Sequence, residues 1–176
     1  MFRDWENYYL LVGSAAGALI GLMFVVTTLT AGLDANRVSR GVKVYITPIV
    51  FHFSNVLIVS AISAVPQIPT AAVGVLVALC AAAGIVYSAA TTVRLSRTGW
   101  EDPPDTSDKW FYGIVPTIAY LALAGAAFAV WLVSRIAAYA VGATVLVLLL
   151  IGIRNAWDLA TSIVQSPANR REKTKS

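Results

Sequence analysis

Charged residues are scarce in this chain. Asp, Glu, Lys and Arg make up 12% of its 176 residues, whereas an ordinary soluble domain has about 25%. Hydrophobic residues make up 58%, and they occur in blocks of about 18 or more with almost no charge, which is the pattern of a membrane-spanning helix. These proportions exclude a soluble globular domain and favour an integral membrane protein.

Groups that carry out chemistry are scarce as well. The chain has one cysteine, Cys80, so no intramolecular disulfide can form, and one histidine, His52. The sequence has no His-Glu-x-x-His metal site, no glycine-rich phosphate loop and no potassium-filter sequence. Because the apolar blocks also lack a catalytic triad or paired carboxylates, we expect no enzyme activity, no metal and no cofactor.

Five apolar blocks divide the chain. We predict transmembrane spans over residues 8–31, 42–64, 70–93, 110–133 and 136–153. The last two belong to one apolar run that only Ser134 and Arg135 interrupt, and this run is about twice the length of a membrane span, so it must fold back as a hairpin. The fold class that we expect is all-α, a bundle of five transmembrane helices over residues 1–165.

The last helix is expected to extend past the hydrocarbon to about residue 165. Ala156, Leu159, Ala160 and Ile163 would share one apolar face there, lying along the inner leaflet. Pro167 should then end the helix, and residues 166–176 should form a disordered basic tail.

Basic residues predict the orientation. With five spans, all but two of the 13 Lys and Arg residues fall on one side, the exceptions being Arg3 and Arg135. The positive-inside rule therefore places the N-terminus outside and the C-terminus in the cytoplasm. Since the basic residues lie beside membrane spans, we expect the lipid bilayer and no nucleic acid as a partner. The pattern is typical of small proteins of the bacterial inner membrane, which is the localisation that we expect.

Glycines form a stripe in the first span. Gly13, Gly17 and Gly21 recur every fourth residue, so they lie on one face of a helix, where small residues let another helix backbone approach closely. The stripe fits a contact between copies of the chain in a homo-oligomer. It also fits tight helix packing inside one bundle.

The second span contains the sole histidine and an asparagine. Helical spacing places His52 and Asn55 on one face with Tyr45, Pro48 and Val59, near the bilayer midplane. An ionisable group at that depth is costly and is a functional candidate, here as the polar lining of a solute or proton path. Alternatively, a neutral His52 is hydrogen-bonded to a neighbouring helix and only holds the bundle together.

Hydroxyl groups gather in the inner halves of the spans. Thr47, Ser88 and Thr117 would continue the path from His52 towards the cytoplasm. The alternative is that these hydroxyls bond back to carbonyls of their own helices and line no cavity.

Two charged residues lie near the inner boundary. Arg154 and Asp158 are one helical turn apart and would form a charged cytoplasmic mouth. In the alternative interpretation, Arg154 only extends its charge from the end of the span into water. Asp108 closes an acidic loop that we expect to be solvated.

These features leave two hypotheses of function. The first is a homo-oligomeric channel or passive transporter for an ion or small solute. Its pore would lie between copies, because five short helices enclose little interior. Its path would be lined by His52, Asn55, Tyr45, Thr47, Ser88 and Thr117, with Arg154 and Asp158 at the mouth. The alternative is a non-conducting membrane adaptor or regulatory subunit that binds a partner protein or anionic lipid through its basic tail.

Overall fold

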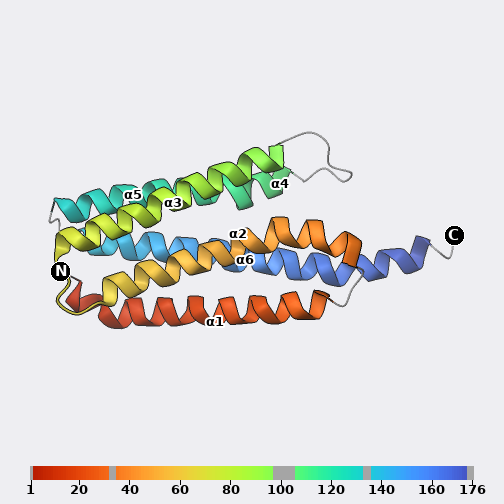
Figure 1. The fold of residues 1–176 in the computed structure, drawn as a ribbon, viewed down its shortest axis with the longest axis horizontal. Coiled ribbons are helices and arrows are strands. Elements are labelled where there is room, and N and C mark those ends of the chain that lie inside the picture. The colour runs from red at the N-terminus through yellow and green to blue at the C-terminus, as the bar shows by residue number, and fades with distance from the viewer. Residues whose placement is uncertain (1, 32–34, 97–105, 133–135, 174–176) are drawn as a thin grey trace.

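Long apolar segments form helices in a bilayer, because a helix pairs its backbone N–H and C=O groups within itself. The computed structural model describes residues 2–31, 35–96, 106–132 and 136–173, and nearly all of this part is helical (Figure 1). The long helices are α1 (Glu6–Ala31), α2 (Ala35–Ala64), α3 (Thr70–Ser96), α5 (Val115–Trp131) and α6 (Ile136–Lys173). The short elements are η1 (Arg3–Trp5), α4 (Thr106–Lys109) and a π-helical turn, η2 (Trp110–Ile114).

The predicted number of long apolar helices, five, is confirmed in the described part of the chain. Five segments are long and apolar enough to cross a membrane, namely Glu6–Thr28, Tyr45–Ala64, Thr70–Ser96, Ser107–Trp131 and Ile136–Thr161. The predicted hairpin is confirmed too, because α5 ends at Trp131 and α6 begins at Ile136. The fold is therefore all-helical, and its five apolar helices indicate an integral membrane protein.

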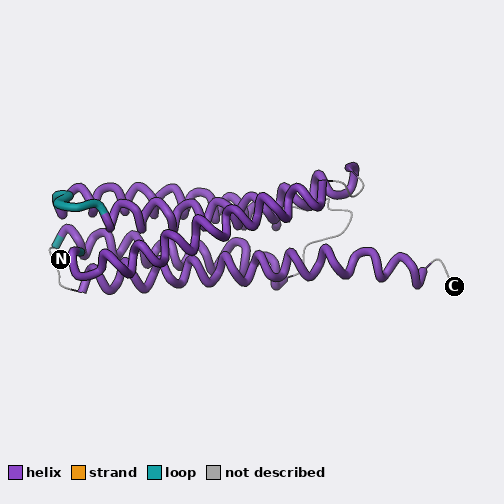
Figure 2. Tube along the Cα trace, turned by 90° about the horizontal axis from the view of Figure 1, so that it is seen from below, coloured by secondary structure: helices purple, strands orange, loops and turns teal. Residues whose placement is uncertain are grey.

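The long helices run side by side along one axis (Figures 1 and 2). Helix α2 packs against α1, α3 and α6, and α5 packs against α3 and α6. In the apolar windows of α2 and α6, 56% of the residues are buried, against 22% in α1. Helices α2 and α6 therefore form the centre of the bundle, and α1 covers one side.

The connection between α2 and α3 is a short turn that contains Pro66 and Pro69, residues that favour turns. Within it, Gln67 adopts a φ of 58°, in the left-handed region that favours glycine. This turn lies at the end of the bundle where the N-terminus is found (Figure 1).

The predicted end of the last helix is wrong. Helix α6 continues through Pro167 to Lys173, so residues 166–173 are helical and do not form the expected disordered tail. A proline lacks one N–H and therefore removes one main-chain hydrogen bond, and a helix can continue beyond the kink that results. Residues 174–176, like Ser134 and Arg135, lie outside the described part of the chain.

Candidate functional site

His52 lies in the interior of the bundle, as its helical face predicts. Its side chain is fully buried, and Nδ1 is 2.9 Å from the hydroxyl oxygen of Tyr120 in α5. Pro48, Asn55 and Val59 on the same face of α2 are buried too. The other ring nitrogen, Nε2, has no hydrogen-bond partner among the described residues. Whichever nitrogen carries the proton, Nε2 is therefore left as a buried polar atom that needs a partner.

Asn55, one helical turn further along α2, also has a buried polar atom without a hydrogen-bond partner among the described residues. Its Nδ2 donates to the carbonyl of Cys80 in α3 over 3.1 Å, whereas its Oδ1 has no partner within the described part of the chain. A buried polar atom without a partner costs about 1–3 kcal/mol. Such atoms in proteins usually mark a bound water or a functional group. Among the described residues, α2 contains four such atoms, and those of His52 and Asn55 lie nearest its middle, whereas the other two, on Ser60 and Ser63, lie towards its end.

Tyr120 is the partner that sequence analysis missed. It is fully buried in α5, in the middle of a span, whereas tyrosines in membrane proteins favour the interfaces. A tyrosine at that depth needs a hydrogen-bond partner for its hydroxyl. The position of Tyr120 in the middle of a span was therefore the feature of the sequence that pointed to a buried partner. The sequence alone does not show that α5 faces His52.

Ser88 and Thr117 connect α3 and α5. The hydroxyl of Thr117 lies 2.9 Å from Ser88 Oγ and 2.8 Å from the Gly113 carbonyl of its own helix. Ser88 Oγ donates to the Gly84 carbonyl over 2.7 Å. Neither of these hydroxyls bonds to His52 or Asn55. Their contacts therefore favour the alternative in which they bond back to nearby helix carbonyls and line no cavity.

Thr47 is not part of the interior. Its side chain is exposed, because its position along α2 turns it away from the face that carries His52. The structure therefore separates Thr47 from the path that the sequence suggests.

A second polar cluster lies at the opposite end of the bundle from the N-terminus. The Tyr45 hydroxyl donates to Asp108 Oδ2 over 3.0 Å, so Asp108 is not simply a loop carboxylate in water. Tyr112 donates to the Asn155 carbonyl, and Asn155 Nδ2 donates to the Phe111 carbonyl, both over 2.9 Å. The first of these bonds joins α2 to α4, and the other two join η2 to α6. The Asn155 side chain thus provides a partner for a carbonyl in the π-helical turn.

Arg154 does not pair with Asp158 in the part of the chain that the structure describes. Its guanidinium lies 3.2 Å from the centroid of the Phe111 ring, and its Nη1 lies 3.4 Å from Asn155 Oδ1. Asp158 is exposed. An arginine followed by an acid one turn later is the weaker order for a helical ion pair, and the aromatic ring attracts the cation instead.

The glycine stripe of α1 divides into two parts. A Cβ atom at Gly13 would lie 3.1 Å from Ser60 Cβ, so Gly13 allows α1 to pack tightly on α2. A Cβ at Gly17 or Gly21 would meet nothing within 4 Å. Tight packing inside the bundle thus accounts for Gly13, while Gly17 and Gly21 face open space within the described part of the chain.

No protein-family model, curated protein or solved structure matches the chain. The case for a function therefore rests on the residues and contacts of the bundle.

Proposed function

We propose that the protein is a passive membrane transport protein in which a proton or a small polar solute passes through the interior of one bundle at His52 and Asn55. The observation that carries this proposal is the pair of buried polar atoms without partners, His52 Nε2 and Asn55 Oδ1, on one face of α2. A transient water or solute would supply the missing hydrogen bonds to both.

The burial of these residues favours a path inside the protomer over a pore between copies. Side chains that are 0% and 6% exposed, as those of His52 and Asn55 are, cannot line a channel between bundles without rearrangement. Homo-oligomerisation stays part of the proposal through Gly17 and Gly21, which leave space for a helix of another copy.

We further propose that the N-terminus is outside and the C-terminus in the cytoplasm of a bacterial inner membrane. The distribution of Lys and Arg supports this orientation. Aromatic rings also gather at the N-terminal end of the bundle, where Trp5 lies 4.6 Å from Tyr139 and 5.3 Å from Tyr8 between centroids. Such clusters are typical of a membrane–water interface.

Flux through reconstituted vesicles tests the proposal. The purified protein is placed in liposomes, proton entry is followed with an entrapped pH dye under a potassium diffusion potential, and urea entry is followed by light scattering. We expect at least one flux to exceed that of empty liposomes. It should fall in His52→Phe, which keeps a ring without nitrogens, and in Asn55→Leu, which keeps the volume without the amide.

Thr47→Ala is the matched control, because Thr47 is exposed on the same helix. Its flux should equal that of the wild type. Fluxes equal to those of empty liposomes, or no effect of either interior variant, would rule out the proposed path.

One observation supports the adaptor as a second candidate. Helix α6 runs to Lys173 and projects beyond the other helices (Figure 2). This extension contains Arg170 and Arg171, which could bind an anionic lipid surface or an acidic partner. An adaptor should retain its binding in His52→Phe and lose it when the chain is truncated before Ala168.

A further inference from the structure

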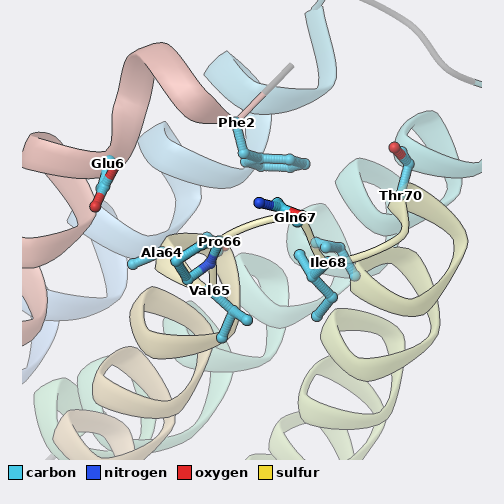
Figure 3. Close-up of a pocket in the computed structure, with 10 residues that line it drawn as sticks. Phe2, Glu6, Ala64, Val65, Pro66, Gln67, Ile68 and Thr70 are labelled. Atoms are coloured by element: carbon cyan, nitrogen blue, oxygen red, sulfur yellow. The ribbon is translucent and has the colours of Figure 1, made fainter.

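A pocket of about 240 Å³ lies at the N-terminal end of the bundle (Figure 3). It forms where the N-terminal segment meets the turn between α2 and α3. Its walls include Phe2 and Glu6 from that segment and from the start of α1, and Ser63, Gln67, Ile68 and Thr70 from the opposite side. The pocket is separate from His52 and Asn55, neither of which lines it.

One carboxylate lies in the described lining of the pocket. Among the described residues that line it, Glu6 is the sole ionisable one. Three further residues, Ser63, Gln67 and Thr70, carry side-chain oxygens. A positively charged ligand with N–H or O–H donors therefore matches the described lining.

An aromatic face completes the lining. Figure 3 shows the Phe2 ring above Gln67. The face of an aromatic ring attracts a cation electrostatically. The pocket thus combines a carboxylate with a ring face and hydroxyl and amide groups.

Ser63 provides an independent indication of a ligand. Its side chain is 3% exposed and it lines the pocket. The Tyr9 hydroxyl interacts with it, but the geometry falls short of a full hydrogen bond to its Oγ. The neighbouring Tyr9 hydroxyl donates instead to the Ala138 carbonyl over 3.1 Å. A ligand that hydrogen-bonds to such a buried hydroxyl at the pocket wall is stabilised by the bond that it forms.

We propose that this pocket binds a small ammonium group, either of a free amine such as ethanolamine or of a phosphatidylethanolamine headgroup. The carboxylate of Glu6 balances its charge, the Phe2 ring covers it, and Ser63 and Gln67 accept its donors. The volume of about 240 Å³ is below the roughly 300–1,000 Å³ of pockets for drug-sized ligands, which suits a ligand of a few heavy atoms. The adjacent Trp5 and Tyr8 rings mark the depth at which lipid headgroups lie.

Ligand-observed NMR with ethanolamine tests the proposal on the full-length protein in maltoside micelles, which carry neither amine nor charge. We expect saturation transfer from the protein to ethanolamine and none to ethylene glycol. Glu6→Gln should weaken binding about two- to fivefold, the effect of one exposed charge pair. Added salt should weaken binding of the wild type in the same direction.

Asp4→Asn is the matched control, because Asp4 is an exposed acid close to Glu6 that does not line the pocket. Its affinity should equal that of the wild type. Ser63→Ala is a second pocket variant, which should also weaken binding while the far-UV spectrum stays unchanged.

Phosphatidylethanolamine added to the micelles distinguishes the two sources of the ammonium group. If the pocket binds the lipid headgroup, the added lipid displaces ethanolamine from the wild type. If the pocket binds a free amine, the added lipid leaves ethanolamine binding unchanged. Absence of saturation transfer to the wild type in pure maltoside would overturn the proposal. Equal losses in Glu6→Gln and Asp4→Asn would also overturn it, because general surface charge would then explain the binding.

Discussion

The contact between Tyr120 and His52 depends on Gly84, a glycine of α3. Gly84 of α3 lies against the ring of Tyr120, and a Cβ atom there would collide with ring carbons. The glycine thus lets α5 approach α3 closely enough for the Tyr120 hydroxyl to lie 2.9 Å from His52 Nδ1.

Gly84→Ala should therefore destabilise the bundle. The added methyl group must displace the buried Tyr120 ring, and overpacking of this kind costs about 1–3 kcal/mol. Gly125→Ala is the control, because a Cβ at Gly125 meets nothing within 4 Å and alanine favours a helix by up to about 1 kcal/mol. Thermal unfolding in detergent should give a lower midpoint for Gly84→Ala and an unchanged or higher one for Gly125→Ala. The reverse order would contradict this packing.

The sequence predicted part of the site at the residue scale. His52 and Asn55 were assigned to one face of a helix because the helical period follows from the spacing alone. Tyr120, Gly84 and the ring beneath Arg154 were not predicted, because which helices face one another depends on packing between segments far apart in the chain.

At the scale of elements, the turn between α2 and α3 contains a strained residue. Gln67 has a φ of 58°, a conformation that costs a non-glycine residue about 1–2 kcal/mol and a β-branched residue more. The turn also forms one wall of the pocket that contains Ser63, so its conformation sets the shape of that pocket.

Substitutions at Gln67 should separate backbone strain from side-chain contacts. Gln67→Val should lower the unfolding midpoint, because valine tolerates a positive φ poorly, while Gln67→Gly should not lower it. Both variants remove the amide, so a loss of stability in Gln67→Gly as large as that in Gln67→Val would show that the side chain, and not the backbone conformation, stabilises the turn. Calorimetry in detergent gives the comparison.

The number of helices was predictable and some of their details were not. Apolar length sets the count, since each block matches one membrane crossing, and the break at Ser134 and Arg135 was sufficient to divide the longest run. The π-helical turn η2 could not be predicted, because a bond from Asn155 in another helix satisfies one of its carbonyls. The end of α6 was misjudged because a proline does not by itself stop a helix.

At the scale of the whole molecule, the bundle has open space along one side of α1. Gly17 and Gly21 have open space where a side chain would be, and close approach of two helix backbones over such a stripe is a common basis of membrane assembly. We predict that the protein is a homo-oligomer and that Gly17→Leu reduces its mass to that of the monomer.

Native mass spectrometry in detergent or nanodiscs measures this mass. Gly125→Leu is the control, since Gly125 also faces open space but lies on α5. A wild-type protein that is monomeric throughout the concentration range would refute the oligomer, yet it would leave a path inside one bundle intact.

The most direct test of that path uses the fact that the chain has one histidine. In protein labelled with ¹⁵N-histidine and ¹⁵N-glutamine, free of a histidine tag and placed in hydrated bilayers, every imidazole signal in solid-state NMR comes from His52. The account predicts magnetisation transfer from water to the imidazole, weakened by Asn55→Leu, because a mobile polar species must reach Nε2. An imidazole that receives no transfer from water, while the exposed Gln67 amide does, would contradict the account and leave His52 as a packing residue bonded to Tyr120.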